Sequence, residues 1–229
     1  QDALADVSPE VRRHAIRLAE HFVEDAPGIQ TGLLQLAADP VREVRYQLAF
    51  TLGELETTTR LKALQAVLLQ DPVDPWIRLA TLSSLQRDGG QIFQALAANG
   101  AFVGSDAGAE FLQTLARQVG AANQKGEVAG VLQAINQAAS VAAPAVIFKA
   151  EAIVGPHQLV PYLGAGRHTG KVSNLAYHNS LMVQFWSALA ARDTRLLTHV
   201  MATHFPPVLT NATYATYLRC HDDIGPDVV

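Results

Sequence analysis

This chain has little cysteine, no strong excess of positive or negative charge, and no long apolar run. Cys220 is the only cysteine, so no disulfide can form within the chain. Lys and Arg number 17 against 21 Asp and Glu, and this balance offers no basic surface for nucleic acid. No signal peptide is recognised, and no apolar run approaches the ~20 residues of a membrane-spanning helix. We therefore expect a cytoplasmic chain without nucleic-acid or membrane partners.

Apolar residues are plentiful, at 49% of 229 residues, which is enough for one large domain or two small ones. The first residue is Gln1 rather than methionine. On that ground we expect a chain that is processed, trimmed or a fragment.

A repeat runs through the first part of the chain. Arg12, Arg45 and Arg78 are spaced by 33 residues each time. The residues around them repeat as well, namely Asp6, Asp39 and Asp71 before them, Val11, Val44 and Ile77 beside them, and Ile16, Ala49 and Leu82 after them. A fixed period of this size indicates stacked pairs of helices. We expect further helices over 28–38, 59–69, 90–98, 109–119 and 125–143, with a glycine-rich loop at 99–108.

The Asp, Pro and Val-Arg pattern resembles HEAT-type repeats. The resemblance implies an α-helical solenoid over residues 1–138, with a ladder of hydrogen bonds between the Asp and Arg of neighbouring repeats. The third copy has one more residue between Asp71 and Arg78. The sequence therefore does not decide whether this copy makes the ladder contact. The concave face of a solenoid suits a protein partner. The arginines that we expect to contribute are Arg12, Arg13, Arg17, Arg42 and Arg45.

After Pro144 the pattern changes to alternating strands and helices. Strands are predicted over 145–150, 173–177 and 213–220, and helices over 156–163, 180–191 and 194–203. This alternation favours parallel βα units over residues 139–229.

Acidic residues follow the first and last of these strands. Glu151 comes after the first, and His221, Asp222 and Asp223 come after the last. The apolar neighbours Ile147 and Ile153 predict burial and a raised pKa for the Glu151 carboxyl. A glycosidase needs such an acid beside a carboxylate that stays ionised. The alternative is an ordinary strand-end glutamate in an ion pair with Lys149.

Three segments resemble glycoside hydrolase family 13, the α-amylase superfamily, and in particular its amylosucrase-like and trehalose-synthase-like members. They are FKAEAIVGP at 148–156, YHNSLMVQFWSALAARD at 177–193 and TYLRCHDDIG at 216–225. The resemblance spans about 127–225. It implies that Glu151 is the general acid/base at the end of barrel strand 5. It also implies that Asp222 stabilises the transition state at the end of strand 7 and that His221 binds sugar hydroxyls.

The family's nucleophile is missing. In the family an Asp at the end of strand 4 attacks the sugar, and a retaining enzyme needs it ~5 Å from the acid. The helical repeat stands where strands 3 and 4 would be, and Pro226 stands where the family has an aromatic residue. We therefore expect a mainly α chain, with a helical solenoid followed by an incomplete (β/α)8-barrel segment. A join would fall near 127–138.

Two functions follow from the sequence. The first is a fragment or fusion derived from a retaining α-glycosidase that acts on α-glucosides or sucrose, inactive alone. The second is a non-catalytic scaffold that binds a protein on its helical repeats. No cofactor or metal is expected, because His199 and His204 lack a third ligand nearby. Trp76 and Trp186 are expected to be packing residues.

Overall fold

The structure of the chain is a computed structural model that describes residues 2–22, 27–55, 59–204 and 210–219. It divides into two compact units, an N-terminal unit of residues 1–128 and a C-terminal unit of residues 129–229. The predicted domain boundary after residue 138 falls within helix α9, Lys125–Ala142, and stays a prediction.

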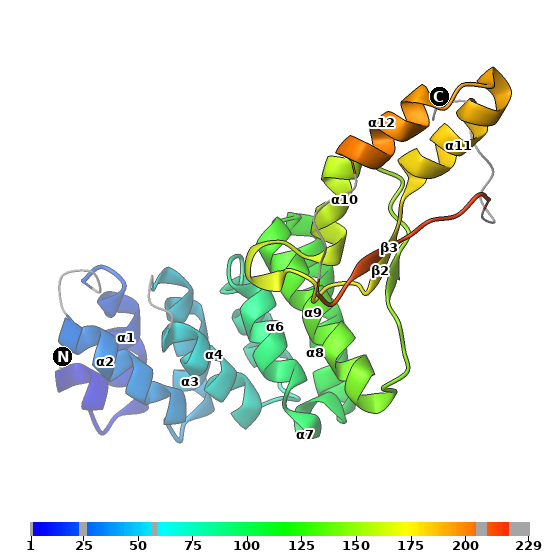
Figure 1. Cartoon of the computed structure of the whole chain (residues 1–229). Coiled ribbons are helices and arrows are strands. Elements are labelled where there is room, and N and C mark those ends of the chain that lie inside the picture. The colour runs from blue at the N-terminus through cyan, green and yellow to red at the C-terminus, as the bar shows by residue number, and fades with distance from the viewer. Residues whose placement is uncertain (1, 23–26, 56–58, 205–209, 220–229) are drawn as a thin grey trace. The chain divides into compact units, whose positions relative to one another are not determined.

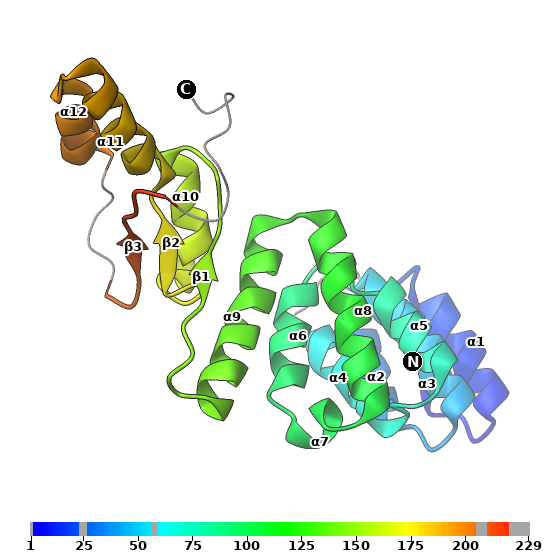
Figure 2. The same ribbon diagram turned by 90° about the vertical axis from the view of Figure 1, so that its right-hand side faces the viewer.

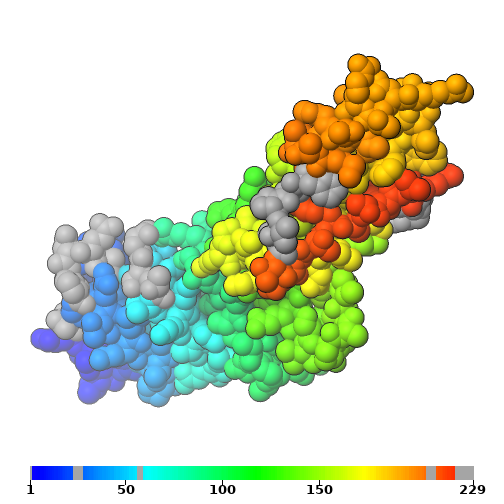
Figure 3. Space-filling model, in the orientation of Figure 1, coloured from blue at the N-terminus to red at the C-terminus, as the bar shows by residue number. Residues whose placement is uncertain are grey.

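The N-terminal unit is helical, as predicted (Figure 1). Its helices are η1 (Asp2–Ala5), α1 (Pro9–Ala19), α2 (Pro27–Gln35), η2 (Leu36–Ala38), α3 (Arg42–Thr51), η3 (Leu52–Glu54), α4 (Thr59–Gln70), α5 (Pro75–Ser83), α6 (Gly89–Ala97), α7 (Gly100–Val103) and α8 (Asp106–Ala122). Helix α1 packs on α3, and α3 packs on α5. The helical pairs therefore stack in chain order, which Figure 3 shows as a blue, cyan and green succession within this unit.

Capping residues fix where these helices begin. Ser8 caps α1, because its side chain accepts from the Val11 N–H just before Pro9. Asp74 caps α5 in the same way, accepting from the N–H groups of Trp76 and Ile77. The prediction of a loop over 99–108 is wrong, because two further capping residues begin helices there. Asn99 begins α7 and Ser105 begins α8 within it.

The core of the N-terminal unit uses the repeat positions. Ala19, Leu52 and Leu85, each seven residues after a repeat arginine, are buried, as are Val44 and Ile77 next to the arginines. The same offset from each arginine thus points inward in successive repeats. Period and burial agree because each helix pair can bury its apolar side only against the next pair.

The C-terminal unit contains a small parallel sheet. The elements of this unit are α9, β1 (Lys149–Ala150), α10 (Pro156–Leu163), η4 (Gly166–His168), β2 (Leu175–Tyr177), α11 (Asn179–Ala191), α12 (Arg195–Thr203) and β3 (Thr213–Ala215). The strand order is β1-β2-β3, and both pairings are parallel (Figure 2). Lys149 pairs with Leu175, and Leu175 pairs with Thr213. The three predicted strands are present but shorter than predicted, and the described residues form no barrel.

The core of the C-terminal unit is small. Its buried cluster consists of Ala152, Leu159, Leu163, Ala176 and Ala212. Three of these five residues are alanines. Helix α11 buries Leu181 and Met182 near its start, whereas Leu189 near its end is exposed. Among the described residues of the whole chain, no helix has the length and apolar character needed to cross a membrane.

Candidate functional site

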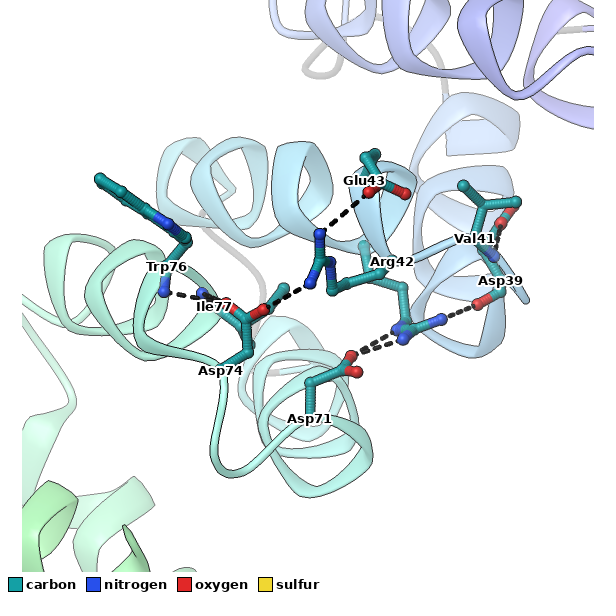
Figure 4. A network of polar contacts seen from close by, with 9 residues as sticks. Asp39, Val41, Arg42, Glu43, Asp71, Asp74, Trp76 and Ile77 are labelled. Atoms are coloured by element: carbon teal, nitrogen blue, oxygen red, sulfur yellow. Dashed lines mark hydrogen bonds and ion pairs between the residues drawn. The ribbon is translucent and has the colours of Figure 1, made fainter.

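An arginine ladder joins the first three repeats. Arg12 donates from Nε and Nη2 to the Asp39 carboxylate at 2.7 and 3.0 Å. Arg45 repeats this contact with the Asp71 carboxylate at 2.9 and 2.5 Å (Figure 4). Each arginine also donates from Nη1 to a carbonyl six residues earlier, that of Asp6 or Asp39. The predicted ladder is therefore confirmed for these two steps. The pKa of Arg12 is raised by its hydrogen bond to Asp39.

The third arginine binds differently. Arg78 pairs with Glu110 of α8 at 2.9 Å, a contact that the sequence left open. A second kind of link joins Arg60 of α4 to Asp88 at 2.7 Å. Half-buried Arg12 and buried Arg45 serve this internal ladder, and their predicted role as partner contacts stays a prediction. Of the five arginines predicted to contribute, Arg13, Arg17 and Arg42 are exposed.

A pocket of about 300 Å³ opens between α3 and α5. Its walls are Arg42, Glu43 and Tyr46 from α3, and Asp74, Trp76 and Ile77 from the start of α5. The buried Ile77 side chain lines it, and the Tyr46 ring is held edge-on against Phe50 at 5.2 Å. The pocket thus has an apolar interior and a charged border.

Arg42 holds the charges of this border in place. Its guanidinium bonds the Glu43 carboxylate at 3.1 Å and the Asp74 carboxylate at 3.0 Å (Figure 4). The Glu43 hydrogen bond, followed by the charge of Asp74, raises the pKa of Arg42. The pKa of Glu43 is lowered by a hydrogen bond from its own backbone and then by Arg42. Arg42 and Glu43 therefore stay ionised across the neutral range.

Trp76 lies at the surface beside this pocket. Its side chain is 63% exposed, so the prediction that it is a packing residue is wrong. Leu79, three residues further along α5, is also exposed, and so is Val73 in the turn that precedes the helix. The repeat period contained the signal, because it aligns Trp76 with Glu10 and Glu43, both typical surface residues.

In the C-terminal unit, Glu151 directly follows β1 at the carboxyl edge of the sheet. The side chain is exposed, as are Ile147 and Ile153 on either side of it. The apolar enclosure predicted for the carboxyl is therefore absent, because the strand is too short to draw these neighbours into the core. Asp222 and His221 lie outside the described residues. The roles of all three residues stay predictions.

Asn179 joins the ends of the three strands. Its Nδ2 donates to the Ala152 carbonyl after β1 at 2.6 Å, and its Oδ1 accepts from the Tyr217 hydroxyl after β3. The Tyr217 ring lies 4.5 Å from that of Tyr177, and the Lys149 ammonium lies 4.2 Å from the Tyr177 ring centre. Sequence reasoning missed Asn179, although its place directly after a predicted strand was visible.

His178 is buried next to Asn179 and caps α11. Its Nδ1 accepts from the Leu181 N–H at 3.1 Å, and its ring packs against Tyr214. Burial lowers the pKa of His178 and raises that of the Tyr214 hydroxyl. A neutral imidazole is therefore the native form, and it is needed as an acceptor. Among the described residues no group of three or more His, Cys, Asp or Glu side chains could hold a metal ion.

The comparison with protein families concerns the N-terminal unit. A family model for HEAT repeats matches residues 1–86. The matched segment contains Arg12, Arg45 and Arg78, both confirmed ladder steps and the pocket between α3 and α5. It ends before 127–225, where the resemblance to glycoside hydrolase family 13 stays a prediction. The N-terminal 86 residues of this chain are therefore similar to HEAT repeats.

Proposed function

We propose that the N-terminal unit is a scaffold that binds a protein partner, and that the pocket between α3 and α5 is its binding site. The observation that carries the proposal is the exposed Trp76 beside a preformed pocket within the HEAT-like segment. HEAT repeats commonly mediate protein interactions. A large apolar side chain left in water costs free energy, which a partner recovers by covering it.

The residues of the pocket support this choice. Trp, Tyr and Arg dominate the binding energy of protein interfaces, and Arg42, Tyr46 and Trp76 line this one pocket. The partner inserts an apolar side chain over Ile77. Polar groups of the partner bind at the charged border around Arg42. Exposed Leu79 extends the contact along α5, and exposed Val73 extends it to the turn before that helix.

The test uses Trp76 as its own reporter. Trp186 is the only other tryptophan, so the full chain with Trp186→Phe has a single indole. Peptides selected from a random display library against this chain should quench or blue-shift the Trp76 emission and should bind competitively. Binding should weaken at least tenfold in Tyr46→Ala, which keeps the reporter. Gln65→Ala, a polar position on α4 outside the pocket, is the matched control.

If the selected peptides bound Tyr46→Ala and Trp76→Ser as tightly as the original chain, the pocket would not be the binding site. Failure of repeated selections to give any binder to the N-terminal unit would contradict the scaffold function itself.

A second function rests on one observation in the C-terminal unit, the placement of Glu151 at the carboxyl edge of a parallel sheet. We propose that this unit derives from a retaining α-glycosidase, as an incomplete (β/α)8-barrel segment. Glu151 would be the acid/base, Asp222 the transition-state stabiliser and His221 a sugar ligand. The chain alone should not turn over α-glucosides or sucrose, because it lacks the nucleophile.

The release of glucose or fructose from sucrose, maltose and amylose tests this second function. No release is expected from the chain alone. Release that disappears in Glu151→Gln would show that a nucleophile is present after all.

A further inference from the structure

The border of the pocket between α3 and α5 carries more negative than positive charge. Its lining residues include one guanidinium, that of Arg42, and two carboxylates, those of Glu43 and Asp74. Arg13 also acts on Glu43, but its positive charge is offset by Glu10 on the same helix. A charged group of a partner therefore meets an excess of one carboxylate at this border, and complementarity of charge favours a cation there.

The two carboxylates differ in how accessible they are. Asp74 caps α5 and accepts from Arg42, and its side chain is only 13% exposed. The Glu43 side chain is 53% exposed and accepts from Arg42 through Oε1. Asp74 is therefore held by the helix that it caps, whereas the Glu43 carboxylate lies open to a ligand.

Arg42 is poorly suited to bind an anion of the partner. Its Nη1 donates to Asp74 at 3.0 Å, and its Nη2 donates to Glu43 at 3.1 Å (Figure 4). A partner carboxylate would have to displace one of these bonds, and it would then lie beside two negative groups. Placing like charges together is unfavourable at an interface, so the border discriminates against acidic partners.

Trp76 supplies a second feature that a cation recognises. Its side chain is largely exposed and borders the same pocket as Glu43. The face of an indole attracts cations, and the flat guanidinium of arginine stacks on it. A guanidinium also bonds a carboxylate through two parallel N–H groups, which an ammonium cannot do. An aromatic face and an open carboxylate at one border therefore favour arginine over lysine.

We propose that the partner segment bound in this pocket carries an arginine next to its apolar anchor. The arginine stacks on Trp76 and bonds the Glu43 carboxylate, while the apolar anchor covers Ile77. The methylene stem of the arginine adds to the apolar contact. This choice of partner rests on the proposed function of the pocket, and it names the group that the charged border selects.

The test uses peptides selected from the random display library against the full chain with Trp186→Phe, and Trp76 emission measures their affinity. The binders should contain an arginine close to an apolar residue. Each binder is then resynthesised with citrulline in place of that arginine, which keeps the shape and removes the charge. Affinity should fall roughly tenfold or more, because a charge-assisted hydrogen bond and a cation–π contact are lost. Lysine in place of the arginine should restore only part of it.

Glu43→Gln removes the carboxylate but keeps an acceptor for Arg42. This variant should weaken the binding of the arginine peptide and leave that of the citrulline peptide nearly unchanged, because the two changes remove the same contact. Glu10→Gln is the matched control. Glu10 occupies the position of Glu43 in the first repeat, is exposed as well and does not line the pocket, so this variant should change neither affinity.

Different results would separate this inference from the scaffold function. Binders that lack arginine, that carry acidic residues in its place or that bind equally well with lysine would overturn the choice of arginine and leave the scaffold function intact. An equal loss of affinity for the arginine and citrulline peptides in Glu43→Gln would overturn the contact with that carboxylate. Failure to obtain any binder would contradict the scaffold function and this inference together.

Discussion

Replacement of Arg45 by methionine tests whether the ladder holds the repeats together. The Arg45 side chain is 5% exposed and its partner Asp71 is 18% exposed. Methionine keeps most of the apolar stem but leaves the Asp71 carboxylate and the Asp39 carbonyl without their donor. Loss of one partner of a buried ion pair costs about 3–5 kcal/mol. Because Asp71 retains some contact with water, we expect about 3 kcal/mol, a large share of the ~5–15 kcal/mol of a typical domain.

The assay is urea unfolding of the full chain followed by far-ultraviolet circular dichroism. Arg42→Met is the matched control, because Arg42 also bonds an aspartate of the next repeat but its side chain is 56% exposed. It should shift the midpoint far less, since exposed ion pairs contribute little. Adding Asp71→Leu to Arg45→Met should restore part of the stability that Arg45→Met loses, because an apolar pair avoids the buried charge.

An Arg45→Met midpoint equal to that of Arg42→Met would refute this reasoning. The apolar contacts at the flanking repeat positions would then hold the repeats together without the ladder.

Three further predictions concern single residues. Gly108→Ala should destabilise α8, because its new Cβ would lie 1.9 Å from a backbone oxygen, whereas Gly120→Ala on the same helix meets nothing within 4 Å and should gain up to ~1 kcal/mol by thermal melting. The C-terminal unit should lose stability as pH falls below about 6.5. Burial keeps His178 neutral in the folded state, so the unfolded chain binds the extra proton there, and His178→Gln should flatten this dependence in melts between pH 8 and 5. Asn179→Ala should cost about 1–3 kcal/mol by urea unfolding of the C-terminal unit, because two hydrogen bonds at the strand ends are lost, and an unchanged midpoint would contradict that role.

The sequence determined the repeat, and with it much of the N-terminal unit. A 33-residue period places the same residue types on the same side of successive helices, and the resemblance to HEAT-type repeats implied the ladder that Arg12 and Arg45 form. It also located α10, α11 and α12 to within a residue or so. Local signals suffice there, because proline, capping residues and apolar spacing act within a few residues of the helix ends.

Tertiary structure alone decided exposure and partnership. The pocket beside Trp76 exists only because α3 packs on α5, and the burial of Arg45 depends on the repeat that follows it. Arg78 could be assigned to Glu110 only once α8 was placed. Glu151 kept its predicted place after a strand but not its predicted apolar surroundings. Burial depends on what other segments bring to a site, and a one-dimensional pattern does not contain that information.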